Sequence, residues 1–299
     1  MKIDLSGKRA VISGSTAGIG YAIAVGLATA GAHVILNGRT ADRVEEATRR
    51  LQAKVPNAAV EGFAADLATA EGIAAFTLRA PAADILVNNL GIFEPKPFLD
   101  IPDADWDRFF RINVLSGVRL SRHYLPGMME RGWGRIVFLS SESGVQIPAE
   151  MIHYGMTKTA QLAIARGLAE MAAGSGVTVN AVLPGPTRSE GVGQFVTDLA
   201  AAQGKSEAEV EADFFATMRP SSLIKRFAEV EEVANLVVYV CSLQASATTG
   251  AALRVDGGVI RAIVLRQQHR RPRHLAGRFS SWPRDSAAAS LRQRSSAQG

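Results

Sequence analysis

A tyrosine and a lysine, Tyr154 and Lys158, lie four positions apart in the segment Tyr-Gly-Met-Thr-Lys. On a helix, residues at i and i+4 share one face, so the Lys158 ammonium can lie beside the Tyr154 phenol. An unperturbed phenol has a pKa of about 10 and is a poor base at neutral pH, but a nearby cation favours the phenolate. The pair therefore predicts acid/base chemistry carried by a helix.

A serine hydroxyl precedes this pair. Ser141 ends an apolar run 13 residues before Tyr154, and its hydroxyl could polarise a substrate carbonyl together with the phenol. Ser140 and Ser143 are competing hydroxyls, which we interpret as strand-end or turn residues. His153 adjoins Tyr154, and we expect it to be structural or to line a pocket.

The first apolar run leads into a glycine-rich segment, Ser13-Gly-Ser-Thr-Ala-Gly-Ile-Gly20. Glycines at 14, 18 and 20 allow a tight turn and a close approach of the backbone to a diphosphate, and the helix that follows would present free N–H groups to it. The spacing G-x3-G-x-G differs from the common G-x-G-x-x-G fingerprint. By itself, the motif is equally compatible with an ordinary glycine-rich turn.

The second apolar run ends at Asn37-Gly-Arg-Thr40, without the carboxylate that NAD-selective dinucleotide folds usually place there for the ribose hydroxyls. Arg39 offers a guanidinium that can pair bidentately with a 2′-phosphate, which favours NADP(H) as the cofactor, with NAD(H) as the alternative. The other interpretation is that Arg39 is a solvated residue ahead of an N-cap at Thr40.

Taken together, these residues resemble the short-chain dehydrogenase/reductase family, and in particular its members similar to 3-oxoacyl-carrier-protein reductases. The motifs that carry the resemblance occur in the family's order between about residues 5 and 263: Gly14-x3-Gly18-Ile-Gly20, Asp66, Asn88-Asn-Leu-Gly91, Asn113, Ser141, Tyr154-x3-Lys158, Asn180 and Pro184-Gly185.

The resemblance implies a role for each matching residue. Tyr154 would be the catalytic acid/base, and Ser141 would orient the substrate carbonyl. Lys158 would hold the nicotinamide ribose and tune the phenol, while Asn113 would support a water in the proton relay. The implied cofactor contacts are Gly14, Ser15, Thr16, Gly18, Ile19, Gly20, Arg39, Asp66, Leu67, Asn88, Gly91, Tyr154, Lys158, Pro184, Gly185, Thr187 and Ser189. The resemblance implies no metal site.

Short apolar runs of strand length alternate with segments of helical spacing. The predicted strands are 9–13, 33–36, 60–64, 85–87, 135–139, 177–183 and 252–255, and the predicted helices are 19–30, 41–54, 106–130, 154–173 and 230–241. This alternation predicts parallel βαβ units and a single Rossmann-like doubly wound α/β domain, with a central parallel sheet and helices on both faces.

Residues 10–38 contain no Asp, Glu, Lys or Arg, which raises the alternative of a membrane-spanning helix. Glycines divide the stretch into pieces that are too short to cross a membrane, so we interpret it as strand, turn, helix, turn and strand.

Residues 1–265 are predicted to form one dinucleotide-binding catalytic domain. Within it, residues 188–227 interrupt the alternation and predict a substrate lid or binding loop, the alternative being a surface excursion without a role. Residues 266–299 contain 8 Arg and 1 Asp. This basic tail is predicted to be disordered, and we do not expect it to bind nucleic acid. The single Cys241 is expected in the core and provides neither a disulfide nor a zinc cluster.

The resulting hypothesis is an NADP(H)-dependent oxidoreductase that transfers a hydride between nicotinamide and the carbonyl or secondary alcohol carbon of a small-molecule substrate. The alternative is a non-catalytic dinucleotide-binding or interaction protein on the same scaffold. The resemblance further implies a homo-oligomer, either a tetramer or a dimer. Because the N-terminus lacks the pattern of a signal peptide, we expect a cytoplasmic protein that does not associate with membranes.

Overall fold

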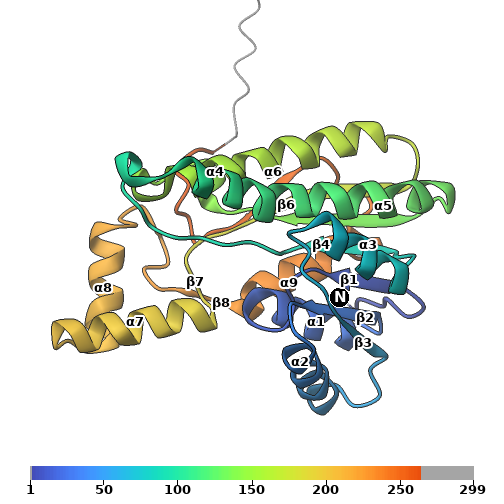
Figure 1. Ribbon diagram of the computed structural model, residues 1–299, viewed down its shortest axis with the longest axis horizontal. Helices are drawn as coiled ribbons and strands as arrows, with labels where there is room; N and C mark the ends of the chain where they lie inside the picture. The colour runs from blue at the N-terminus through green and yellow to red at the C-terminus, as the bar shows by residue number, and fades with distance from the viewer. Residues whose placement is uncertain (1, 264–299) are drawn as a thin grey trace, which may run out of the picture. The chain divides into compact units, whose positions relative to one another are not determined.

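The computed structural model describes residues 2–263, and all of its helices and strands lie in a compact unit comprising Met1–Arg261. Within the described residues, the central sheet has seven parallel strands in the order β3-β2-β1-β4-β5-β6-β9 (Figure 1). The strands are β1 (Arg9–Ile12), β2 (His33–Gly38), β3 (Val60–Ala64), β4 (Ile85–Asn88), β5 (Gly134–Leu139), β6 (Val177–Pro184) and β9 (Ala252–Val255). The predicted doubly wound α/β fold is confirmed.

Helices cover both faces of this sheet. One face packs against α1 (Gly18–Thr29), α2 (Ala41–Lys54) and α9 (Val230–Val240), and the other packs against α3 (Ala70–Arg79), α5 (Ser116–Glu130) and α6 (Ile152–Met171). Helix α4 (Asp103–Phe110) leads into α5 through a π-helical turn, η2 (Arg111–Leu115). Short 3₁₀ turns are η1 (Phe98–Asp100), η3 (Glu142–Gly144), η4 (Ala149–Met151) and η5 (Leu243–Ala245).

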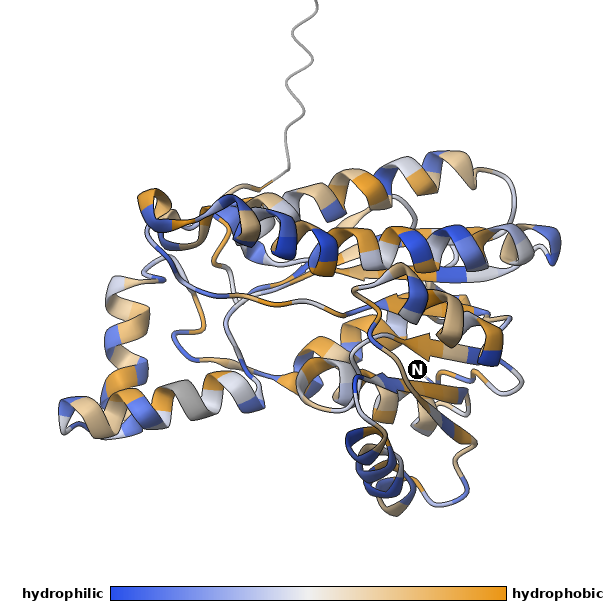
Figure 2. Cartoon of the chain, viewed as in Figure 1, coloured by the Kyte–Doolittle hydropathy of each residue, from blue (hydrophilic) through white to orange (hydrophobic). Residues whose placement is uncertain are grey.

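Alternation along the strands explains why two helix layers form. In β1, Ala10 and Ile12 belong to the cluster beneath α1 and α9, while Val11 belongs to the cluster beneath α5 and α6. Successive side chains of a strand point to opposite faces, so strands that are apolar at every position must be covered on both sides. Figure 2 shows the strands of the sheet as mainly apolar and the outer helix α2 as mainly polar.

The strand order brings the candidate residues to one edge. Because the strands are parallel, their carboxyl ends meet there, and the direction of the connections reverses between β1 and β4. Ligands of open α/β sheets bind outside the carboxyl ends at such a switch point. The segments that follow β1, β4, β5 and β6 contain most of the residues named by the resemblance.

The predicted strands agree with the observed ones to within two residues, and four of the predicted helices agree similarly with α1, α2, α6 and α9. The predicted helix over 106–130 is helical throughout, but it begins earlier, at Asp103, and the π-helical turn divides it into α4 and α5. Helix α3 was not predicted. Residues 10–38 form β1, α1 and β2, as the sequence predicted.

The predicted insertion, residues 188–227, has a structure of its own. Strand β7 (Thr187–Arg188) pairs in parallel with β8 (Ala228–Glu229), and α7 (Glu190–Gln203) and α8 (Glu207–Thr217) lie between them. These two helices pack on a small separate cluster that includes Val196, Phe215 and Phe227. Hereafter, "the insertion" denotes residues 188–227.

Among the helices of residues 2–263, none is both long and apolar enough to cross a membrane. The predicted basic tail, 266–299, lies outside the described residues.

Candidate active site

The loop after β1 is a tight glycine turn. Gly14 and Gly18 have φ angles of +62° and +56°, which side chains other than glycine rarely adopt. A Cβ at Gly20 would lie 2.5 Å from the carbonyl oxygen of Gly14. The three glycines of the motif are therefore required by the backbone path of this loop.

Neutral side chains hold the glycine loop in place. The Asn37 Oδ1 accepts a hydrogen bond from the Gly14 N–H at 3.1 Å, and the Ser15 Oγ accepts one from the Asn37 N–H at 2.9 Å. The Asn89 Nδ2 donates to the carbonyl oxygens of Ser13 at 3.0 Å and Gly14 at 2.9 Å. Sequence reasoning missed these roles of Asn37 and Asn89, although each residue stands at or just after the end of a strand.

The first turn of α1 can accept an anion. Within the described chain, Ala17 at the N-cap provides no side-chain hydrogen bond, and the first turn contains no acidic residue. The N–H groups around Gly18 and Ile19, together with the helix dipole, favour a phosphate there. Ser15 is different: it is fully buried, and its N–H and hydroxyl are already hydrogen-bonded within the protein. Thr16 flanks the turn, and its carbonyl oxygen accepts from Arg50 at 2.7 Å.

Arg39 is available at the end of β2. Its side chain is exposed, and it forms no hydrogen bond or ion pair with residues 2–263. A Cβ at Gly38 would lie 2.6 Å from Thr16 Cγ2, so β2 ends close against the glycine loop. Thr40 is the N-cap of α2 but makes no side-chain hydrogen bond to the helix. The guanidinium is therefore free to meet an anion near the glycine loop.

The predicted cofactor contacts after β3 and at the end of β4 differ in burial and in their hydrogen bonds. Asp66 is exposed, and its Oδ1 accepts from the N–H of Ala68 at 3.0 Å. Leu67 is buried in the core. The Asn88 Nδ2 donates to Ser121 Oγ at 3.1 Å and joins β4 to α5, while its buried Oδ1 has no partner within residues 2–263.

The segment after β6 returns to the glycine loop. Strand β6 ends at Pro184, and the Thr187 hydroxyl then donates to the Gly185 carbonyl oxygen at 2.9 Å. A Cβ at Gly18 would lie only 3.4 Å from Ser189 Cβ. The segment after β6 and the glycine loop, both of which are predicted to contact the cofactor, are therefore neighbours.

Ser141 and Tyr154 meet at the same edge. Ser141 follows β5, Tyr154 lies in the first turn of α6, and the Ser141 hydroxyl is near enough to influence the pKa of the Tyr154 phenol. The ring of Phe93 packs edge-on against Tyr154 with centroids 6.4 Å apart. Burial raises the pKa of the Tyr154 phenol above its ordinary value, and the Ser141 hydroxyl acts in the opposite direction.

Lys158 lies on the same face of α6, with its Nζ 5.6 Å from the centre of the Tyr154 ring. The Nζ donates to the Leu139 carbonyl oxygen at 2.8 Å and to Gln161 Oε1 at 3.3 Å. Burial lowers the pKa of Lys158 to about 7. A Cβ at Gly91 would lie 3.5 Å from this Nζ, so the glycine leaves room beside the ammonium.

Asn113 lies in the π-helical turn and connects to Lys158. Its Oδ1 accepts a hydrogen bond from the Ile92 N–H at 2.8 Å. Its Nδ2 donates to the Ile92 carbonyl oxygen and to Thr157 Oγ1, both at 3.0 Å. The backbone carbonyl oxygen of Asn113 accepts from Gln161 Nε2 at 2.6 Å, and Gln161 in turn accepts from Lys158. Such turns in helices frequently mark functional sites.

The neighbouring candidates have structural contacts. The Ser140 hydroxyl donates to the Lys158 carbonyl oxygen at 2.8 Å. His153 is fully buried, and its ring packs on Phe109 with centroids 4.1 Å apart. Burial lowers the pKa of His153. Cys241 is buried in the core cluster. These contacts fit the structural roles expected for them.

Sequence reasoning also missed a buried charge beside Ser141. Glu142 is 4% exposed, and its Oε2 accepts from Ser141 Oγ at 2.7 Å and from the Ser143 hydroxyl. Its Oε1 accepts from the Nε of Arg219, which belongs to the insertion, at 2.9 Å. Arg219 is 9% exposed and also donates to Glu150 Oε1 at 3.1 Å. The only hint in the sequence is a carboxylate placed between two serines at a strand end.

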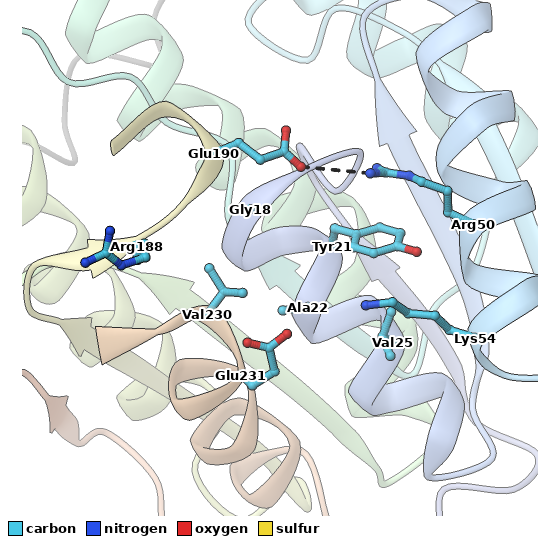
Figure 3. A pocket seen from close by; sticks show the side chains of 10 residues that line it. All are labelled: Gly18, Tyr21, Ala22, Val25, Arg50, Lys54, Arg188, Glu190, Val230 and Glu231. Carbon is cyan, nitrogen blue, oxygen red and sulfur yellow. Dashed lines mark ion pairs between the residues drawn. The ribbon is translucent and has the colours of Figure 1, made fainter. Parts of the chain in front are cut away.

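A pocket of about 240 Å³ lies beside Gly18 and Tyr21, bordered by α1, α2 and the starts of α7 and α9 (Figure 3). Arg50 and Glu190 face each other across it, with Nη1 and Oε1 3.9 Å apart. Because Arg50 also bonds the Thr16 carbonyl oxygen, this pocket adjoins the glycine loop and not the Tyr154 end of the site.

The two ends of this edge together fit a nicotinamide dinucleotide. The glycine loop exposes backbone without the Cβ atoms that other residues would place there. The start of α1 has no side-chain cap, so its N–H groups can bind a diphosphate. Arg39 is unpaired near one end, while Lys158 and Tyr154 lie at the other.

Comparisons with known proteins identify the family of this chain. The family model described as enoyl-(acyl carrier protein) reductase matches residues 14–260. An uncharacterized oxidoreductase, YvaG, of Bacillus subtilis is 47% identical over 88% of this chain and all of its own length. A D-beta-hydroxybutyrate dehydrogenase of Rhizobium meliloti is 35% identical over 84% of this chain and 98% of its own.

Among solved structures, the L-sorbose reductase of Gluconobacter frateurii, in complex with NADPH and L-sorbose, aligns with a TM-score of 0.83. It is 35% identical and covers 88% of this chain and all of its own. The chain therefore belongs to the short-chain dehydrogenase/reductase family and is an NAD(P)-dependent dehydrogenase/reductase.

Proposed function

We propose that this protein uses NADP(H) to interconvert a carbonyl compound and the corresponding secondary alcohol, with Tyr154 as the acid/base. The observation that carries the proposal is the meeting of Tyr154, Ser141 and Lys158 at the carboxyl edge of the sheet. A binding module without a reaction would not need a phenol, a hydroxyl and a buried amine gathered at this point.

The preference for NADP(H) rests on Arg39. Its guanidinium is exposed and unpaired within residues 2–263 at the end of β2, where a 2′-phosphate would accept bidentate hydrogen bonds. The L-sorbose reductase that aligns with this chain was solved with NADPH, which supports the same choice.

The residues of the chain divide the work of the reaction. In the reductive direction, the carbonyl carbon receives a hydride from the reduced nicotinamide and the oxygen receives the proton of the Tyr154 hydroxyl, which yields the alcohol and the oxidised cofactor. Ser141 orients the substrate oxygen beside the phenol. Lys158 in its protonated form favours the phenolate that remains, and its burial strengthens this interaction.

The test is a screen of NADPH and NADH oxidation against 3-oxoacyl thioesters, keto sugars, other ketones, aldehydes and quinones. Turnover with at least one carbonyl class supports the proposal. Binding of NADPH without turnover of any class would favour the alternative, a non-catalytic dinucleotide-binding protein.

Replacement of Tyr154 by Phe tests whether Tyr154 is the catalytic acid/base. We expect Tyr154→Phe to lower kcat about 1,000-fold, because the transferable proton is lost while the ring remains. The dissociation constant for NADPH, measured by fluorescence titration, should stay within about twofold of wild type, since the ring still packs against Phe93. A variant that retains wild-type kcat contradicts the assignment.

A further inference from the structure

Glu142 and Arg219 form a buried ion pair directly behind the candidate catalytic serine. Carboxylates and guanidinium groups are rarely this buried unless they are paired. Here, the pairing joins two distant parts of the chain, because Glu142 follows β5 and Arg219 lies 77 positions later in the insertion. The position of the insertion is thereby linked to the loop that contains Ser141.

The hydrogen bonds of Ser141 are almost fully assigned by this arrangement. A serine hydroxyl has one proton to donate and two lone pairs to accept with. The proton is directed to Glu142 Oε2 at 2.7 Å, and one lone pair accepts from the Ser143 N–H at 3.1 Å. The second lone pair remains for the Tyr154 phenol, whose pKa the Ser141 hydroxyl lowers. Glu142 therefore holds the Ser141 oxygen in place while no substrate is bound, and the hydroxyl proton must turn from Glu142 to the substrate oxygen when a carbonyl compound binds.

We propose that Glu142 is a positioning residue for Ser141, and that Arg219 holds Glu142 in place, so that the insertion forms part of the machinery for turnover. The inference rests on the proposed function, in which Ser141 orients the substrate oxygen. It assigns no substrate contact to either charged residue. Their effect is exerted on the serine and, through their charges, on the phenol.

The charges of the pair act on Tyr154 in opposite directions. Burial is the largest influence and raises the pKa of the phenol, and the Ser141 hydroxyl lowers it. The Glu142 carboxylate then raises the pKa and the Arg219 guanidinium lowers it. Lys158 faces the ring from the same helix, and Phe93 contributes no charge. Removal of either charge should therefore move the pKa of the phenol, in opposite directions for the two residues.

The first experiment compares Glu142→Gln with wild type in steady-state kinetics with NADPH and the best carbonyl of the screen. We expect kcat to fall about tenfold, or about 1.4 kcal/mol, with the NADPH dissociation constant unchanged within twofold. In a Ser141→Ala background, the same replacement should cause no further loss. An equal additional loss in that background would show that Glu142 does not act through Ser141, and would overturn the proposal.

Glu150→Gln is the matched control. Glu150 bonds Arg219 at 3.1 Å but is one-third exposed and makes no contact with Ser141 among the described residues. Its replacement should leave kcat within about twofold of wild type. A loss as large as that of Glu142→Gln would assign the effect to the general integrity of the ion pairs and contradict a positioning role.

The second experiment follows the pH dependence of alcohol oxidation, whose acid limb reports the deprotonation of Tyr154. The midpoint should move to lower pH in Glu142→Gln and to higher pH in Arg219→Met. Because loss of one partner leaves a buried charge, the double variant Glu142→Gln/Arg219→Met and the charge-preserving Arg219→Lys are included. Both should melt closer to wild type than Arg219→Met does. Midpoints that move in the same direction in the two single variants overturn the proposal.

A crystal structure of Glu142→Gln tests the inference without any turnover. We expect the Ser141 hydroxyl to leave its wild-type rotamer or to lose its contact with Tyr154, and an unchanged Ser141 would contradict the proposal. If the wild-type protein turns over none of the carbonyls, the proposed function fails, while this structure still decides whether Glu142 positions Ser141.

Discussion

Two loops at the carboxyl edge of the sheet carry the site, and different forces hold them. The glycine loop after β1 is fixed by uncharged groups of the two adjacent strands, namely Asn37 near the end of β2 and Asn89 just after β4. The loop after β5 is fixed by the Glu142–Arg219 ion pair, whose second member comes from the insertion.

The two kinds of interaction predict that cofactor binding and the reaction depend differently on pH. Neutral hydrogen bonds contribute about 1 kcal/mol each and depend little on pH, so the cofactor end should keep one shape over a wide range of conditions. The reacting end combines a buried ion pair with a buried lysine, and its energetics therefore change with protonation. Variants of the two loops should thus fail in different ways.

The largest effect on cofactor binding is expected at the glycine loop. In Gly20→Ala, the new Cβ would lie 2.5 Å from the Gly14 carbonyl oxygen, so the loop must shift. We expect NADPH affinity to fall about 100-fold, or about 2.7 kcal/mol, because the displaced loop no longer fits the diphosphate. Fluorescence titration measures the loss.

Gly167→Ala on α6 serves as the control for this change, since a Cβ there meets no atom within 4 Å. It should leave NADPH affinity unchanged and stabilise the helix slightly. Equal affinities in Gly20→Ala and wild type would mean that the glycine loop does not hold the cofactor.

The pH dependence of stability tests the reacting end. The folded-state pKa of Lys158 is about 7, against 10.5 for the free side chain. Between these values the unfolded chain binds a proton at this lysine that the folded chain lacks, so the contribution of Lys158 to stability rises with pH by up to about 1.4 kcal/mol per unit.

The measurement is urea unfolding of wild type and Lys158→Met at pH 7.5 and 9.5, without added cofactor. The free energy of unfolding of wild type should rise, relative to the variant, by up to about 2.7 kcal/mol over this interval. If the free energies of unfolding of the two proteins differ by the same amount at both pH values, Lys158 does not contribute to the pH dependence of stability.

The smallest effect concerns cofactor choice. Wild type should bind NADPH at least about tenfold better than NADH, or about 1.4 kcal/mol, and Arg39→Ala should erase most of that preference without changing NADH affinity. The dissociation constants of wild type and Arg39→Ala for NADPH and for NADH measure this preference. If wild type binds NADPH and NADH equally well, Arg39 does not recognise the 2′-phosphate and is only a solvated residue at the start of α2.

The sequence predicted most of the sheet because its strands are short apolar runs between turn residues, and parallel pairing then places the segments after β1, β5 and β6 together. It did not predict helix α3, although Thr69 precedes that helix and accepts from the Gly72 N–H at 2.9 Å. A threonine in this position is a start signal that the periodicity alone did not reveal.

The π-helical turn and the Glu142–Arg219 pair could not be predicted. The turn around Asn113 depends on bonds to Ile92 and Gln161, which lie on other segments. Charged residues are ordinarily assigned to the surface, so Arg219 gives no sign of burial, and Glu142 gives only its place between two serines, until the fold brings them together.

The Glu142–Arg219 pair also bears on how this scaffold could be re-engineered. A loop graft that replaces residues 188–227 by the segment of a relative removes Arg219 and leaves the Glu142 charge buried. An uncompensated buried charge costs about 3–5 kcal/mol, a large part of the stability of a typical domain, about 5–15 kcal/mol. A graft keeps that stability only if the donor segment supplies a cation at position 219 or if position 142 is neutralised in the same step. Substrate range on this scaffold should therefore change through paired substitutions 77 positions apart.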